Sequence, residues 1–139
     1  MASSPLICVV DDQADFRFLL QQIFYSYLPT YPVYFFDSGY ALLDELLDLS
    51  PKPSLILLDR HMPNLDGHQT LLSLKGNSLY KRIPVVMMSA DAADWEINGC
   101  YEAGVNSFLE KKMDFQELKK VVERVCQYWL EINQKPIEA

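Results

Sequence analysis

Apolar residues along the chain follow two patterns, short continuous runs and longer stretches with helical spacing. Runs at 6–10, 33–36 and 85–88 contain several β-branched, aromatic or other large apolar residues, which favours buried strands, and 54–58 and the shorter stretch at 106–109 are also predicted to be strands. Apolar residues three and four positions apart are typical of amphipathic helices, and they recur at 16–27, 39–49, 67–74, 94–103 and 114–130. The pattern therefore predicts five strand–helix units in alternation.

Strands that alternate with helices over short connections predict an α/β fold, a doubly wound parallel sheet with helices on both faces. A chain of 139 residues has the size of a single domain. We expect that domain to span residues 1–139, with its core at about 6–130 and a loose C-terminal tail at 131–139. Because such sheets bind ligands at the carboxyl ends of their strands, the residues that follow each strand deserve most weight.

The last predicted helix begins with a capping box, in which Asp114 is followed three residues later by Glu117. Its expected inner face consists of Leu118, Val121, Val122, Val125 and Trp129. Tyr128 and Leu130 flank that face, so apolar residues extend beyond one stripe. This breadth indicates either a wide core face or a partner surface, and on the second interpretation the last helix forms a homodimer.

Charge and cysteine content narrow the classes of partner. Twelve basic and nineteen acidic side chains give a net charge of −7, which argues against direct binding of nucleic acid or of an anionic membrane surface. No apolar run is long enough for a membrane span, and the N-terminus resembles no signal peptide. Cys8, Cys100 and Cys126 lack metal-ligand spacing, so we expect buried thiols in a reducing, cytoplasmic compartment.

Five polar side chains stand where the predicted strands end. Asp11 and Asp12 follow the first strand, Asp59 the third, Ser89 the fourth and Lys111 the fifth. Clustered carboxylates repel one another, and a hard cation such as Mg²⁺ relieves that repulsion. A lysine and a hydroxyl supply a charge and a donor for phosphate oxygens. Each residue alone is more simply explained as a turn residue at a strand end, but the set favours phosphoryl transfer onto a carboxylate.

The chain resembles the receiver domain of bacterial two-component response regulators. Four stretches carry the resemblance: Asp11-Asp12, DRHMPNLDG at 59–67, MMSA at 87–90 and FLEK at 108–111. It implies a flavodoxin-like sheet with strand order 2-1-3-4-5. The stretches PNLDGH, CYEAGVNSFLEK, MDFQELKKVVERV and YWLEI are also similar to stand-alone receivers that partner cyanobacterial and other bacterial phytochromes. On this resemblance we expect a stand-alone response regulator without an output domain.

The resemblance implies a role for each acidic residue. Asp59 would be the phosphoacceptor, taking its phosphoryl group from a sensor histidine kinase, of phytochrome type on the closer resemblance. Mg²⁺ would be bound by Asp12, by Asp59 and by the backbone carbonyl of His61, with Asp11 assisting partly through water. Lys111 would pair with Asp59 at rest.

The resemblance also implies the groups that bind and read the phosphoryl group. Ser89, the backbone of Ala90 and Lys111 would bind its oxygens. Ser89 and Phe108 would form the switch, with the aromatic ring turning inward as the hydroxyl moves toward the phosphoryl group.

Three further positions lie close to the expected site. His61 and Asp91 lie two residues beyond Asp59 and Ser89, where they would tune the phosphoryl lifetime or simply be exposed loop side chains. Lys112 stands where the family usually has a proline, often with a cis bond before it. Because a cis bond without proline costs about 3 kcal/mol, a trans Lys111–Lys112 bond is expected here.

Two other functions compete with the phosphorylated switch, which would not be a metabolic enzyme. A receiver fold could act as a phosphorylation-independent adaptor, although all five key side chains are present. An aspartyl phosphatase or phosphotransferase of the haloacid-dehalogenase type needs a second acid two residues after its nucleophile, and that residue is His61 here.

Overall fold

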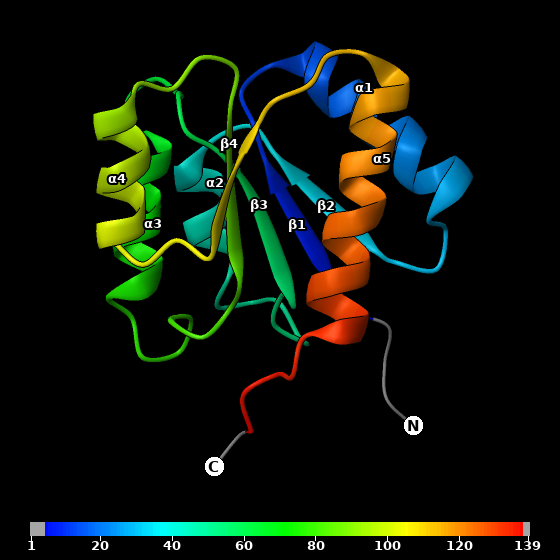
Figure 1. The fold of residues 1–139 in the computed structure, drawn as a ribbon. Helices are drawn as coiled ribbons and strands as arrows, with labels where there is room; N and C mark the ends of the chain where they lie inside the picture. Colours follow the sequence, from blue (N-terminus) through cyan, green and yellow to red (C-terminus); the bar gives the residue numbers. More distant parts are fainter. Residues whose placement is uncertain (1–4, 138–139) are drawn as a thin grey trace.

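The computed structural model describes residues 5–137, which form one α/β domain (Figure 1). Its sheet contains β1 (Ile7–Val10), β2 (Val33–Phe36), β3 (Leu55–Asp59), β4 (Val85–Ser89) and β5 (Ser107–Glu110). All pairings are parallel and the order is β2-β1-β3-β4-β5. The prediction of a doubly wound five-stranded sheet with order 2-1-3-4-5 is confirmed.

Helices cover both faces of the sheet. They are α1 (Ala14–Tyr27), α2 (Gly39–Glu45), α3 (Gly67–Lys75), α4 (Asp94–Glu102), α5 (Phe115–Cys126) and a π-helix (Gln127–Ile132). Helices α1 and α5 lie on one side, whereas α2, α3 and α4 lie on the other (Figure 1). None of the helices within residues 5–137 has both the length and the apolar character that crossing a membrane requires.

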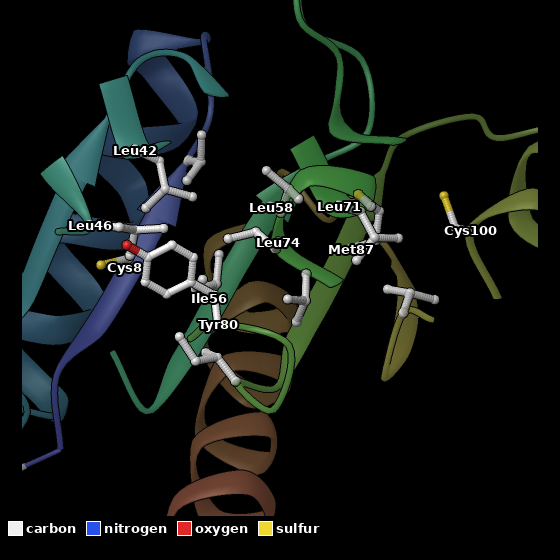
Figure 2. Close-up of a cluster of buried hydrophobic side chains, with 14 of the residues drawn as sticks. Cys8, Leu42, Leu46, Ile56, Leu58, Leu71, Leu74, Tyr80, Met87 and Cys100 are labelled. Atoms are coloured by element: carbon white, nitrogen blue, oxygen red, sulfur yellow. The ribbon is translucent and has the colours of Figure 1, made fainter. Parts of the chain in front are cut away.

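The sheet separates two hydrophobic clusters because side chains of successive strand residues point to opposite faces. Cys8 and Val10 of β1 face the cluster beneath α2, α3 and α4, which Figure 2 shows. Ile7 and Val9 face the cluster beneath α1 and α5. The three cysteines are buried and unpaired, as expected. Burial raises the pKa of the Cys8 and Cys126 thiols to about 12.

The end of the last helix differs from the prediction. Helical structure continues through Ile132, into the expected tail, whose residues 138–139 lie outside the described part of the chain. Leu130 is only 8% exposed and belongs to the core, after Leu118, Val122 and Cys126 at four-residue spacing. Because one α-helical turn takes 3.6 residues, side chains four residues apart move gradually around the helix. The wider π turn rotates Leu130 back toward the core.

Burial of Leu130 narrows the surface on which a homodimer could form. Tyr128 and Ile132 remain exposed at this end of the molecule, whereas Trp129 is partly buried against the core. Dimerisation through the last helix stays a prediction, which light scattering with and without a phosphoryl mimic tests.

Candidate functional site

The register of the sheet gathers the predicted site residues at the carboxyl ends of four strands. Asp59 and Ser89 are the last residues of β3 and β4, and Asp11 and Lys111 directly follow β1 and β5. The backbone N–H of Lys111 donates to the carbonyl of Ser89 at 2.9 Å. Parallel pairing thus places residues that are far apart in the sequence along one edge, as the strand pattern predicted.

Three carboxylates converge at this edge. One oxygen from each of Asp11, Asp12 and Asp59 lies within 4.8 Å of the others, and Asp12 is exposed whereas the other two are buried. Burial, followed by the charge of Asp11, raises the pKa of Asp59 to about 7, against the lowering effect of Lys111. Oxygen ligands of this kind fit a hard divalent cation, which would favour their ionised forms.

Lys111 is held by residues that follow the carboxyl end of β1. Its ammonium group lies 2.8 Å from Asp11 Oδ2 and 3.8 Å from Asp59 Oδ1, and it donates to Gln13 Oε1 at 2.7 Å. Asp11 is therefore a closer resting partner than Asp59, which the sequence analysis had named. Gln13 was not among the predicted site residues, although its position directly after Asp12 placed it near the site.

The bond from Lys111 to Lys112 is trans as expected, since the one cis bond within residues 5–137 is Ser50–Pro51.

The switch candidates Ser89 and Phe108 lie in β4 and β5, and Ala90 and Asp91 lie in the loop after β4. The hydroxyl of Ser89 is buried and finds no hydrogen-bond partner among the described residues, and an orphaned buried donor indicates that an acceptor is missing. Ala90 and Asp91 are exposed beyond it. Phe108 is partly buried against the core cluster. The switching roles of Ser89 and Phe108 stay predictions, as do the roles of Ala90 and Asp91, and the Ser89 hydroxyl is a buried donor without an acceptor at this edge of the sheet.

The two residues after Asp59 contact α4, which sequence reasoning did not anticipate. The guanidinium of the buried Arg60 lies 3.3 Å from Asp66 Oδ2 and 3.6 Å from Glu96 Oε2. Nε2 of the half-exposed His61 lies 3.2 Å from the same Glu96 oxygen. The side chain of His61 therefore has a partner and is not a free loop residue. The only sequence signal for Glu96 was an acid in the first turn of a predicted helix.

The free energy of unfolding of the metal-free protein should fall as the pH rises from about 4 to about 7. The pKa of Asp59 is about 7 when folded and about 3.9 in an unfolded chain. Between these values the folded state binds more protons, so each pH unit removes up to about 1.4 kcal/mol of stability. Urea unfolding in EDTA at several pH values measures the slope. Asp59→Asn should flatten it, and an unchanged slope would assign the effect to other groups.

Comparisons with known proteins identify the family of this chain. The profile of the response regulator receiver domain matches residues 7–123. Response regulator Rcp1 of Synechocystis sp. (strain ATCC 27184 / PCC 6803 / Kazusa) is 32% identical over 131 residues, which cover 91% of this chain and 88% of Rcp1. The probable methanogenesis regulatory protein FilR2 of Methanothrix harundinacea (strain 6Ac) is 37% identical over 84 residues, 60% of this chain and 54% of FilR2. The chain thus spans about half of FilR2.

Two solved structures match the whole fold. The Mn²⁺-bound form of Rcp1 has a TM-score of 0.83 and 30% identity, and the phosphorylated cyanobacterial phytochrome response regulator RcpA has 0.88 and 26%. Each match covers 96% of this chain and 99% of the other. With the profile match over residues 7–123 and the identity to Rcp1, these structures show that the chain belongs to the family of response regulator receiver domains.

Proposed function

We propose that this receiver domain accepts a phosphoryl group on Asp59 from a sensor histidine kinase, in a Mg²⁺-dependent reaction, and so changes which partner it binds. One observation carries the proposal: the oxygens of Asp11, Asp12 and Asp59 converge within 4.8 Å, with the ammonium of Lys111 beside them. This set combines a nucleophile, a cation site and a fixed positive charge, which transfer of a phosphoryl group requires.

The proposed reaction is an in-line displacement. An oxygen of Asp59 attacks the phosphorus of a phosphohistidine, the new O–P bond forms, and the P–N bond breaks as the imidazole leaves. Bound Mg²⁺ would neutralise charge on the phosphoryl oxygens; Asp11, Asp12, Asp59 and the carbonyl of His61 would hold it. The ionised form of Asp59 is the nucleophile, and the pKa of this carboxyl group is raised to about 7. A cation bound before transfer would lower that pKa and so increase the ionised fraction.

Side chains at the ends of β4 and β5 complete the site. Lys111 would exchange its contacts with Asp11 and Gln13 for a phosphoryl oxygen. The unpartnered hydroxyl of Ser89 would donate to a second oxygen, and the backbone N–H of Ala90 to a third. Burial of Lys111 and Ser89 strengthens these contacts because little water competes for them.

Lys111→Met should slow phosphorylation by about 100-fold, since loss of one preorganised charge that faces developing negative charge costs 10² to 10³ in rate. Single-turnover phosphorylation by acetyl phosphate in excess Mg²⁺, followed by intact-protein mass spectrometry, measures the rate. Lys120→Met is the matched control, because Lys120 is exposed on α5. Equal rates for the two variants would remove Lys111 from the mechanism.

Labelling tests the proposed function directly. Incubation with Mg²⁺ and acetyl phosphate should add one phosphoryl group that hydroxylamine removes, and borohydride reduction should locate it at Asp59. Chelation by EDTA should prevent the label. An adaptor that works without phosphorylation gives no label, whereas an aspartyl phosphatase turns over repeatedly on small phosphate esters.

We further propose that the kinase is of phytochrome type. The identity to Rcp1 over nine-tenths of the chain and the structural match to RcpA, a phytochrome response regulator, support this proposal. An autophosphorylated bacterial phytochrome kinase should transfer its phosphoryl group faster than an unrelated histidine kinase does at equal concentration. Equal or slower transfer would refute the phytochrome assignment and leave the phosphoacceptor role intact.

A further inference from the structure

Glu96 joins the start of α4 to the two residues that follow Asp59. It is 9% exposed and lies in the first turn of α4. Its Oε1 accepts a hydrogen bond from the backbone N–H of Ala93 at 3.0 Å. Its Oε2 lies 3.2 Å from Nε2 of His61 and 3.6 Å from the guanidinium of Arg60. One carboxylate therefore caps its own helix and holds the loop after the phosphoacceptor.

Arg60 extends this contact to a third element. Arg60 is 7% exposed, and its guanidinium also lies 3.3 Å from Oδ2 of Asp66, the N-cap residue of α3. Removal of one partner from a buried ion pair leaves the other charge uncompensated. The start of α4 cannot move away from β3 and α3 without exposing Arg60 or breaking its pairing with Glu96.

The resting conformation leaves Ser89, at the end of β4, without a hydrogen bond that another conformation could provide. Its buried hydroxyl has no partner within residues 5–137, and an unmade hydrogen bond of a buried donor disfavours a conformation. Some other contact must offset that loss. The loop at 90–93 connects Ser89 directly to α4, and Glu96 is the residue of that helix that reaches back to the loop after Asp59.

We propose that Glu96 is a positioning residue that restrains α4 and the loop at 90–93 in the resting conformation. Ser89 reaches a phosphoryl group on Asp59 when the contacts of Glu96 with Arg60 and His61 loosen. The inference rests on the proposed function of Asp59. A ligand that favours the second conformation must supply the free energy that breaks these contacts, so their removal raises the apparent affinity for that ligand.

Glu96→Gln tests the restraint, because it keeps the side-chain length and an acceptor for Ala93 while removing the charge that faces Arg60 and His61. The ligand is beryllofluoride with Mg²⁺, a mimic of the phosphoryl group. The apparent affinity should rise at least about fivefold, the lower end of ordinary coupling between sites. Glu102→Gln is the matched control: Glu102 is exposed on the same helix and forms no ion pair among the described residues.

Trp95 provides a readout that does not depend on affinity. It is 72% exposed beside Glu96, and Trp129→Phe removes the chain's other tryptophan. In that background the fluorescence of ligand-free Glu96→Gln should shift toward that of the protein saturated with beryllofluoride. Urea unfolding shows whether the variant is folded, and His61→Ala, which removes the half-exposed contact alone, should give a smaller shift in the same direction.

The results separate this inference from the proposed function. Failure of the natural protein to bind beryllofluoride in Mg²⁺ would overturn the proposed function and this inference with it. Normal binding by the natural protein, with unchanged or weaker binding by Glu96→Gln, would overturn the inference alone. Lower stability without a change in affinity or in Trp95 fluorescence would show that Glu96 has a purely structural role.

Discussion

Asp59→Asn should abolish phosphoryl uptake and, in the absence of a divalent cation, stabilise the folded protein above pH 7. The amide oxygen is too poor a nucleophile to attack phosphorus, so we expect no hydroxylamine-labile label. The stabilisation has an electrostatic cause. Burial and the charge of Asp11 raise the pKa of Asp59 to about 7, which means that the ionised carboxylate is disfavoured in the folded state. Removal of that charge should raise the free energy of unfolding by about 1–3 kcal/mol at pH 8.

Two measurements on one pair of variants check this result. Asp44→Asn makes the same chemical change on the exposed surface of α2 and should alter neither labelling nor stability. Excess Mg²⁺ should stabilise the natural protein and not Asp59→Asn, because the cation loses one of its ligands. A full-strength label on Asp59→Asn would mean that another carboxylate is the phosphoacceptor. Lower stability of Asp59→Asn in EDTA would mean that, in the natural protein, the contact of the Asp59 carboxylate with Lys111 outweighs the cost of burying its charge.

The strand pattern sufficed to predict the fold because the three central strands lie largely in continuous apolar runs. The central strands β1, β3 and β4 are buried along their whole length, which leaves a helix–strand alternation with little ambiguity. The same pattern located the site, since a parallel sheet brings the residues after its strands to one edge. Asp11, Asp59 and Ser89 follow from backbone position alone.

Contacts made by long side chains could not be predicted in this way. Lys111 reaches across the sheet to Asp11 and Gln13, and Arg60 reaches sideways to Glu96. Such partners depend on rotamers and on the packing of helices that are not neighbours in sequence. The pattern left open whether Leu130 belongs to a wide core face or to a partner surface for a related reason, because a π turn changes the spacing of the buried residues.

The close approach of the loop after Asp59 leaves Gly67 no room for a side chain. A Cβ added there would lie 2.2 Å from the carbonyl oxygen of Asp59, 2.7 Å from Cα of Arg60 and 2.9 Å from Sδ of Met87. The first two atoms belong to the backbone and cannot turn aside as a side chain can. The backbone N–H of Gly67 also donates to the carbonyl of Arg60 at 3.0 Å, so the helix cannot retreat without losing that bond.

Gly67→Ala should therefore lower the free energy of unfolding by about 3 kcal/mol or more, at the upper end of the cost of overpacking. Phosphoryl uptake should fall with it, because the displaced atoms belong to Asp59 and its neighbour. Gly99→Ala is the matched control: a Cβ at Gly99, within α4, meets nothing within 4 Å. That change should raise stability by about 0.5–1 kcal/mol. Urea unfolding followed by circular dichroism compares the two, and equal stabilities would show that the loop yields to the added methyl group.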